Sequence, residues 1–268
     1  MNTRTDFRLD ERLGSLAEEY HVASRNQGAF KHMLTAHLVH YSPKIEKLVA
    51  ESPLHVPDKP RIRLPANREP ATLPLDAAIT QRVSSHRFGS SSLSAEKLGS
   101  LLYLGNSVRE VYQQNHAIQY QRNVPNSGNL GSVEVYPIVL NVEGVLPGIY
   151  HYDSVWHDLA LLRQGLVLTW LREHVFYQME FSTPSVALVL TASVGRLAAK
   201  YGLRAYRLAL LDVGHVSQNI YLASTALGLT VCATAGFIDD EIDAAVGADG
   251  LEDATMLIVL VGTSDFER

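Results

Sequence analysis

The sequence lacks several features that define common classes of protein. It has a single cysteine among 268 residues, Cys232, which excludes a disulfide framework and a cysteine zinc site. No apolar run approaches the roughly 18 residues of a membrane span, and the N-terminal stretch has no hydrophobic region of a signal peptide. A net charge of -5 without a long basic run argues against binding nucleic acid by phosphate neutralisation. We therefore expect a cytoplasmic protein that binds neither nucleic acid nor membrane.

Three glycine-rich signatures are also missing. The chain has no GxGxxG, no GxxxxGK[ST] and no GxSxG elbow. Their absence argues against a Rossmann dehydrogenase, a P-loop enzyme and an α/β-hydrolase, but not against a flavin, which several folds bind without such a loop. His37 and His40 could face one metal ion, but no nearby carboxylate or cysteine completes a site, so we predict none.

The order of predicted elements divides the chain into two parts. Residues 1–75 read as a helical N-terminal extension followed by a proline-rich extended arm. Residues 76–268 mix helices with strands and form the main domain. Strands are predicted at 133–142, 148–152, 159–162, 186–191, 231–237 and 256–261, and helices after Ser94 and at 166–179, 208–229 and 240–246. This order favours an α+β domain with an antiparallel or mixed sheet.

The stretch from 196 to 219 is unusual in its distribution of charge. Lys200 and Tyr201 precede a turn with two arginines, and from 208 to 229 the only formal charge is Asp212. Because a soluble helix usually keeps one polar face, we predict that this helix is buried on most sides. It could be the floor of a site, or a core helix whose charged start meets solvent.

Two further segments have residues that suit an anionic ligand. Arg82, Ser84, His86 and Arg87 bring cations and a hydroxyl into six residues, and Arg offers a forked set of donors to a phosphate. The small residues of 125–131 allow the backbone to approach a ligand closely. Taken alone, the first cluster could equally be a solvated loop.

Six short segments, in order along the chain, resemble the SagB-type azoline dehydrogenases of the FMN-dependent nitroreductase superfamily. They are RVSSHRF at 82–88, PNSG at 125–128, GVLPGIYHYD at 144–153, KYGLRAYR at 200–207, GHVSQN at 214–219, and ALGL with TAGF at 226–237. The resemblance spans roughly residue 78 to the C-terminus, with a fainter match at Tyr20, His21 and Ser24. It implies a nitroreductase-like fold, with a mostly antiparallel sheet flanked by helices, that forms a homodimer and binds FMN.

The resemblance implies three groups of FMN-binding residues. One grips the phosphate and ribityl chain, one meets the isoalloxazine, often from the partner subunit, and one offers backbone amides to the reactive edge. In that order they are Arg82, Ser84, His86 and Arg87; Pro125, Asn126, Ser127 and Gly128; and Ala235 and Gly236. The chain departs from the family at His86, where Arg or Lys is usual, and at Gly131-Ser132, where a Tyr-Pro pair is usual.

Lys200 and Tyr201 match the Lys-Tyr pair that these dehydrogenases use for chemistry. The reaction removes a proton from one azoline carbon and a hydride from its neighbour. Lys and Tyr are mostly protonated at neutral pH. Crowding by Arg204 and Arg207 would lower both pKa values, as burial would for the Lys. Either residue could be the base. Alternatively, Lys200 stabilises the carbonyls at the end of a helix and Tyr201 serves as packing.

The predicted function is therefore an FMN-dependent dehydrogenase that oxidises peptide azolines, thiazolines or oxazolines, to azoles, with oxygen reoxidising the flavin. The azoline would be carried by a peptide or a carrier-bound chain, and a cyclodehydratase or synthetase could be the partner. Two alternatives remain: a NAD(P)H-dependent nitroreductase-type flavin oxidoreductase, and a structural subunit of a biosynthetic complex that binds FMN weakly. The peptide, the ring type and the base are left open by the sequence.

Overall fold

The computed structural model describes residues 11–25, 42–52, 54–65, 69–114, 117–165, 167–175 and 183–265. His37 and His40, and much of the N-terminal helix predicted around them, lie outside these residues. Within the described part of the chain, no helix is long and apolar enough to cross a membrane. The cytoplasmic location stays a prediction.

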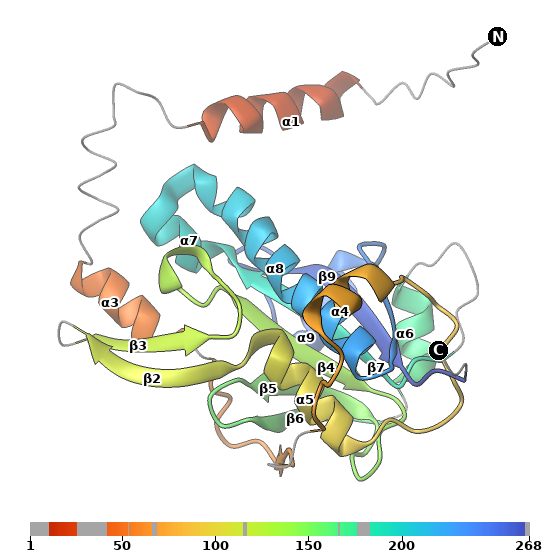
Figure 1. The fold of residues 1–268 in the computed structure, drawn as a ribbon. Helices are drawn as coiled ribbons and strands as arrows, with labels where there is room; N and C mark the ends of the chain where they lie inside the picture. Colours follow the sequence, from red (N-terminus) through yellow and green to blue (C-terminus); the bar gives the residue numbers. More distant parts are fainter. Residues whose placement is uncertain are drawn as a thin grey trace.

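A seven-stranded sheet lies at the centre of the main domain (Figure 1). Its order is β1-β6-β5-β4-β7-β9-β8, and each neighbouring pair is antiparallel. The strands are β1 (Arg61–Arg63), β4 (Val133–Val139), β5 (Gly148–Asp153), β6 (Asp158–Gln164), β7 (Val186–Ser193), β8 (Thr230–Thr234) and β9 (Asp253–Gly262). The predicted α+β domain with an antiparallel sheet is confirmed. β4, β5 and β7 are buried along their whole length, which explains their nearly continuous apolar sequences.

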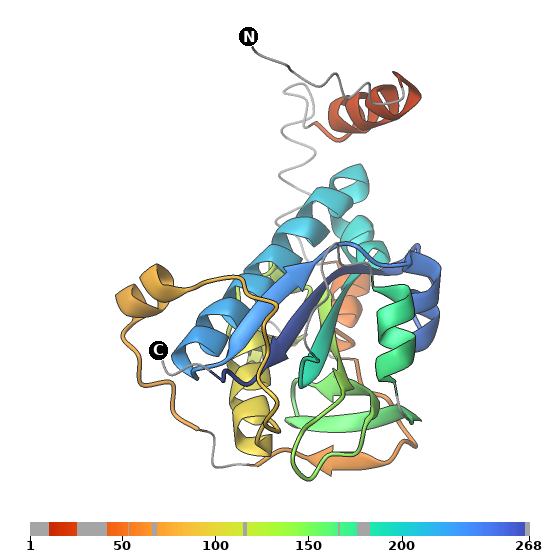
Figure 2. The ribbon, with the colours of Figure 1, turned by 90° about the vertical axis from the view of Figure 1, so that its right-hand side faces the viewer.

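Helices cover both faces of this sheet (Figure 2). On one face, α5 (Ala95–Asn106), α7 (Val194–Tyr201) and α8 (Ala205–Ala226) pack against the larger apolar cluster. On the other, α6 (Leu168–His174) and α9 (Asp239–Val246) pack against a smaller one. Successive residues of β7 alternate between the two clusters, Leu188 facing the first and Val189 the second, as strand geometry requires. Ser94 is the predicted N-cap of α5, and its hydroxyl accepts a hydrogen bond from Lys97 N at 3.2 Å.

The proline-rich arm is partly built into the sheet. Its residues 61–63 form β1, which pairs with β6, and Leu161 N donates to Pro60 O at 2.8 Å. The segment was predicted as an extended linker or arm that could wrap over a neighbour. In the structure it runs along the edge of its own chain's sheet. The remaining N-terminal helices are α1 (Glu11–Ala23), α3 (Pro43–Ala50) and α4 (Leu75–Gln81).

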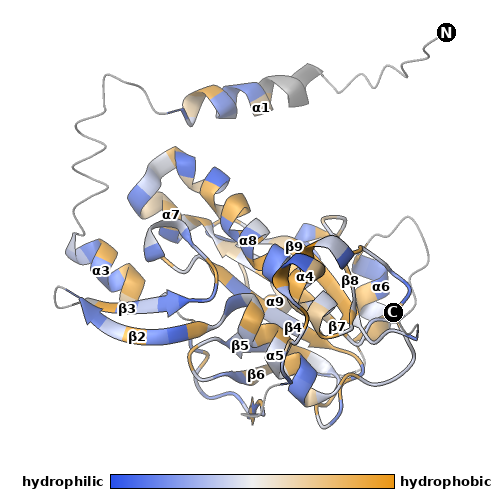
Figure 3. Ribbon diagram, viewed as in Figure 1, coloured by the Kyte–Doolittle hydropathy of each residue, from blue (hydrophilic) through white to orange (hydrophobic). Residues whose placement is uncertain are grey.

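A second, two-stranded sheet projects from the domain beside α3 (Figure 1). It is the hairpin of β2 (Val108–Gln114) and β3 (Ala117–Arg122), which no pattern in the sequence predicts. All of β2 after Val108 is exposed, so its sequence has no apolar alternation. Figure 3 shows the contrast between this largely hydrophilic hairpin and the apolar strands of the main sheet.

Candidate active site

Lys200 and Tyr201 end helix α7, in the position that the sequence predicts. Gly202 follows with φ 55°, a left-handed conformation that suits glycine at the end of a helix. Lys200 is only 6% exposed, and its Nζ lies 5.4 Å from the centroid of the Tyr201 ring. Burial lowers the pKa of Lys200 below its ordinary value, because the charged ammonium loses hydration.

Arg204 and Arg207 bind the end of helix α1. Arg204 Nη1 donates to Ser24 O at 3.2 Å, while Arg207 donates from Nε to Ser24 Oγ at 2.8 Å and from Nη2 to His21 O at 2.7 Å. We expected these two arginines to lower the pKa of Lys200 by crowding. The structure instead assigns the shift to burial, and both guanidinium groups hold carbonyl or hydroxyl oxygens of α1.

The glycine-containing loop at 125–131 meets the Lys-Tyr pair. It contains a short 3-10 turn, η2 (Ser127–Asn129), in which Gly128 has φ 62°. A β-carbon at Gly128 would collide with the Tyr201 hydroxyl and lie 2.8 Å from Lys200 Nζ. Only glycine therefore leaves room for both side-chain tips against this backbone. Two separately predicted groups are thus adjacent in one chain.

Asp212 ties this loop to helix α8. Its side chain is buried, and both carboxyl oxygens accept from Ser127 N, at 3.1 and 3.0 Å. Ser127 Oγ and Ser132 Oγ donate to the same carboxylate at 2.8 and 2.7 Å. Sequence reasoning assigned Asp212 no role. It could have been found as the only charge in a long apolar run, because a buried charge needs hydrogen-bond partners.

The departure from the family at Gly131-Ser132 has a local structural explanation. Gly131 has φ 54°, and a β-carbon there would lie 2.7 Å from Nη2 of the buried Arg122. Gly131 O accepts from Arg196 Nη1 at 2.7 Å, and Ser132 supplies one of the bonds to Asp212. A tyrosine at 131 would meet Arg122, so this chain's loop is built around a small residue.

Arg82 and Ser84 lie at the other end of α8, beside Tyr221. Arg82 Nη1 donates to Ser84 Oγ at 3.4 Å, and the Arg82 guanidinium lies 5.6 Å from the centroid of the Tyr221 ring. Ser84 Oγ and Tyr221 Oη are 3.1 Å apart, and Tyr221 Oη accepts from Ala233 N at 2.8 Å. Tyr221 therefore links the predicted phosphate-binding pair to β8. Sequence reasoning missed it, because a tyrosine in an apolar helix reads as packing.

Ala235 and Gly236 directly follow the end of β8, close along the chain to this cluster. Ala235 is exposed and Gly236 half-buried, and Gly236 N donates to Thr234 Oγ1 at 3.0 Å. The predicted backbone donors thus share one end of the molecule with Arg82 and Ser84. The amide of Gly236 is engaged within its own chain.

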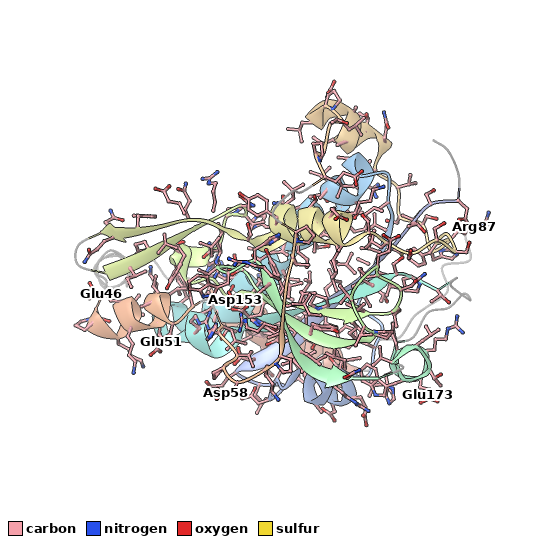
Figure 4. The ribbon with its side chains drawn as sticks, turned by 90° about the horizontal axis from the view of Figure 1, so that it is seen from below. Glu46, Glu51, Asp58, Arg87, Asp153 and Glu173 are labelled. Atoms are coloured by element: carbon pink, nitrogen blue, oxygen red, sulfur yellow. The ribbon has the colours of Figure 1, made fainter. Side chains whose placement is uncertain are left out.

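His86 and Arg87 continue the segment that carries Arg82. Ser85 N donates to Val231 O at 2.9 Å, so the segment runs alongside β8. His86 is half-buried, whereas Arg87 is exposed and lies at the outer edge of the molecule (Figure 4). The structure does not bring Arg87 into the Arg82–Ser84 cluster.

The predicted residues thus form two groups along α8. One group contains Lys200, Tyr201 and the 125–128 loop, and the other contains Arg82, Ser84 and Tyr221. The first group meets α8 at Asp212 and the second at Tyr221, about 14 Å further along the helix at 1.5 Å per residue. Figure 1 shows the same separation, with α7 at one end of α8 and α4, which precedes Arg82, at the other.

One stripe of α8 faces solvent between these two groups. Its exposed residues are Tyr206, Leu210, Leu211, Gly214, His215 and Gln218. The prediction that α8 is buried on most sides holds apart from this stripe, which includes His215 and Gln218. Leu210 and Leu211 are 49% and 59% exposed, and such apolar exposure on a central helix marks an interaction surface. Among the described residues, no cluster of three or more His, Cys, Asp or Glu could hold a metal ion.

Three comparisons place this architecture among known proteins. MJ1384 of Methanocaldococcus jannaschii, named provisionally as a nitroreductase, is 29% identical over 185 residues, which are 69% of this chain and 88% of that protein. A provisionally assigned nitroreductase from Ralstonia eutropha has a TM-score of 0.63 at 21% identity, covering 80% of this chain and 94% of its own. One from Anabaena variabilis has a TM-score of 0.64 at 22% identity. It covers 77% of this chain, which spans 42% of that longer protein.

A chain of the E. coli microcin synthetase McbBCD, in a complex with truncated pro-MccB17 bound, is also similar. Its TM-score is 0.59 at 20% identity, and the match covers 96% of this chain and 95% of the other. At this level of identity the likeness shows the fold alone.

The fold and the site define a flavin oxidoreductase with a mostly antiparallel sheet flanked by helices. The chain belongs to the nitroreductase family, whose sequence model matches residues 79–263. FMN is the cofactor of this family. The residues present fit it: Arg82 and Ser84 offer a guanidinium and a hydroxyl to a phosphate, and the backbone of Gly128 lies against Lys200 and Tyr201.

Proposed function

We propose that this protein is an FMN-dependent dehydrogenase that oxidises thiazoline or oxazoline rings in a peptide to the aromatic azoles. The observation that carries the proposal is the buried Lys200 beside Tyr201, both against the backbone of Gly128. An enzyme that only exchanges hydride has no need of such a pair. An azoline must lose a proton as well as a hydride, and the proton needs an acceptor.

The geometry favours Lys200 as that acceptor. Burial lowers the pKa of its ammonium, so a larger fraction of the side chain is the neutral amine at a given pH. FMN, when bound, supplies the hydride acceptor and is regenerated by oxygen. Tyr201 covers the amine and confines its direction, because the ring and Nζ are 5.4 Å apart. The C-terminal position in α7 fixes both side chains to a rigid element.

We further propose that two copies of the chain form each site. The support for this is the exposed stripe of α8, which runs from Tyr206 to Gln218. If two α8 helices packed antiparallel through their exposed stripes, each Arg82 end would meet the partner's Lys200 end. The exposed leucines Leu210 and Leu211 would be buried by the same contact. We retain on this ground the homodimer predicted from the resemblance.

The extent of the similarity to the microcin synthetase chain supports a peptide substrate. That match covers 96% of this chain, so it includes the N-terminal extension, whereas the matches to the Anabaena and Ralstonia proteins cover 77% and 80%. A chain of this whole architecture occurs in a complex that carries a bound propeptide. By the same reasoning we propose a cyclodehydratase or synthetase partner and a cytoplasmic location. We also retain the predicted division into an extension, 1–75, and an FMN domain, 76–268.

The test is anaerobic reduction of the bound flavin. The purified yellow protein is mixed with a peptide that contains one thiazoline or oxazoline, and absorbance near the flavin maximum is followed. We expect bleaching together with a loss of two hydrogens from the peptide by mass spectrometry. The matched control is the same peptide with the uncyclised Cys or Ser, which should leave the flavin oxidised.

Two outcomes contradict the proposal and point to its alternatives. Rapid bleaching by NADPH, with no response to either azoline, identifies a NAD(P)H-dependent nitroreductase, as the names of several relatives suggest. A colourless protein that takes up no FMN on titration identifies a structural subunit. A yellow protein that responds to the azoline and not to NADPH supports the dehydrogenase.

A further inference from the structure

Asp212 is the only acidic residue of α8, and it is 2% exposed. A carboxylate is costly to bury unless hydrogen-bond donors surround it, so its neighbours must supply such donors. All of its hydrogen-bond donors belong to one short segment, Ser127 to Ser132, which contains Gly128. The carboxylate is thus hydrogen-bonded to the loop and not to the rest of the core.

The loop has an uncommon backbone conformation that hydrogen bonds hold in place. Gly128, Asn129 and Gly131 have φ of 62°, 58° and 54°, a run of left-handed conformations that includes a residue with a side chain. Asn126 Oδ1 accepts from Gly131 N at 2.9 Å and closes the loop on itself. The bonds to Asp212 then fix the closed loop to a rigid helix.

We propose that Asp212 is a positioning residue for the active site. It holds Gly128 where its backbone meets the Tyr201 hydroxyl and the Lys200 amine, and so fixes the loop that faces the flavin against the proton acceptor. This inference rests on the proposed function, since it assigns these two side chains to the chemistry. Asp212 acts through the loop and does not touch the reacting atoms.

The proposal explains why a carboxylate stands here and not an amide. Asp212 has only acceptors, and each oxygen receives at least two donors. In Asp212→Asn the nearly identical shape remains, but one acceptor becomes an NH2 group that faces the donors Ser127 N–H or Ser132 O–H. At least one bond is lost and the loop can shift without a cavity opening in the core.

The experiment compares Asp212→Asn with Asp243→Asn. Asp243 is 5% exposed and accepts from Thr255 N at 2.7 Å, but it belongs to α9 on the opposite face of the sheet. Both variants are examined for thermal unfolding, hydrogen exchange of the 127–132 amides, visible circular dichroism of bound FMN, and kcat and KM for azoline oxidation. Ser132→Ala, which removes one donor and leaves the carboxylate, is the milder variant.

We expect both Asp→Asn variants to unfold at somewhat lower temperature. Only Asp212→Asn should speed exchange of the loop amides, change the flavin circular dichroism and lower kcat at least tenfold, with KM within about twofold. Ser132→Ala should show the same changes to a smaller degree. If Asp212→Asn folds and resembles Asp243→Asn in loop exchange, dichroism and kcat, the inference is wrong. If Asp212→Asn does not fold, the inference is wrong if Ser132→Ala matches wild type in loop exchange, dichroism and kcat.

The measurements also separate this inference from the proposed function. Exchange of the loop amides needs neither FMN nor substrate, and the dichroism needs FMN alone. A wild-type protein with no azoline activity would therefore overturn the proposed function, while changed exchange and dichroism in Asp212→Asn would still support the positioning of the loop.

Discussion

At the level of single residues, two features of the surroundings of Lys200 have opposite effects on its pKa. Lys200 lies in the last turn of α7, where the helix dipole favours a positive charge. It is also 6% exposed, and burial disfavours that charge. The pKa is lowered, so burial outweighs the dipole. At a given pH, a larger fraction of this lysine is therefore the neutral amine than of a fully hydrated lysine.

Replacing the members of the pair should separate chemistry from cofactor binding. We expect Lys200→Ala to lower kcat for azoline oxidation by about 100-fold or more, in the range of general-base catalysis, and Tyr201→Phe to lower it less. Both should keep the yellow FMN complex, and the exposed-surface variant Lys47→Ala should match wild type. The measurement is azole formation at saturating peptide, with FMN content from absorbance. Full activity in both variants would remove the assignment.

At the level of elements, the sequence was informative where burial imposes a pattern. The strands at β4, β7 and β9 follow from apolar runs, and the turn between β5 and β6 from Asp153-Ser154. The β2–β3 hairpin could not be predicted, because β2 is exposed on both sides and burial selects no alternation there. The exposed stripe of α8 could not be predicted for a related reason, because an apolar helix sequence does not show which of its residues the rest of the chain covers.

The arm along the sheet edge depends on a buried carboxylate, Asp153, which Figure 4 places inside the molecule. Burial would raise its pKa, but the hydrogen bonds from His55 at 2.9 Å and Arg61 at 2.6 Å, with two backbone amides, lower it. Arg61 also binds Asp158. The arm is thus held to the sheet by hydrogen bonds to Asp153 that are strong only while this carboxyl group is ionised.

This attachment predicts a specific dependence of stability on pH. A carboxyl whose pKa is lowered by folding stabilises the fold above its unfolded pKa of about 3.9, and the contribution is lost as pH falls through the folded value. We expect the free energy of unfolding to fall below about pH 4, and less so in Asp153→Asn. At pH 7, Arg61→Ala should cost about 1–3 kcal/mol. The exposed Arg63→Ala is the control. Equal denaturant midpoints for the two arginine variants would contradict this.

At the level of the whole molecule, the sequence identified most site residues but not their arrangement. Lys200 and Gly128 are 72 residues apart in sequence and adjacent in space. Arg82 and Lys200 were expected to serve one flavin, and their two groups meet α8 at Tyr221 and Asp212, about 14 Å apart at 1.5 Å per residue. No local pattern contains that distance, because it arises from the length and direction of α8 in the finished fold. Asp212 and Tyr221, which connect the two groups to α8, lie in apolar sequence without a motif.

A mixed dimer tests the division of the site between chains. Arg82→Ala and Lys200→Ala chains with different tags are co-expressed, and dimers carrying both tags are isolated. Each homodimer should be inactive. If sites form between chains, the mixed dimer has one intact site and one doubly altered site, and should show about half of wild-type activity. If each site lies within one chain, the mixed dimer has none and stays inactive. A fully active monomer would also contradict the arrangement.

The edges of the main sheet determine what kind of assembly the exposed helix can make. At one edge, β1 is only three residues long and contains Arg61 and Arg63. At the other, β8 receives a hydrogen bond from the segment that carries Arg82, through Ser85 N and Val231 O. Short, charged or covered edges resist the strand-to-strand growth that leads to aggregates. In the proposed dimer the chains associate through the face of α8 instead, and a two-fold contact there would close on itself, so that growth would stop at two chains.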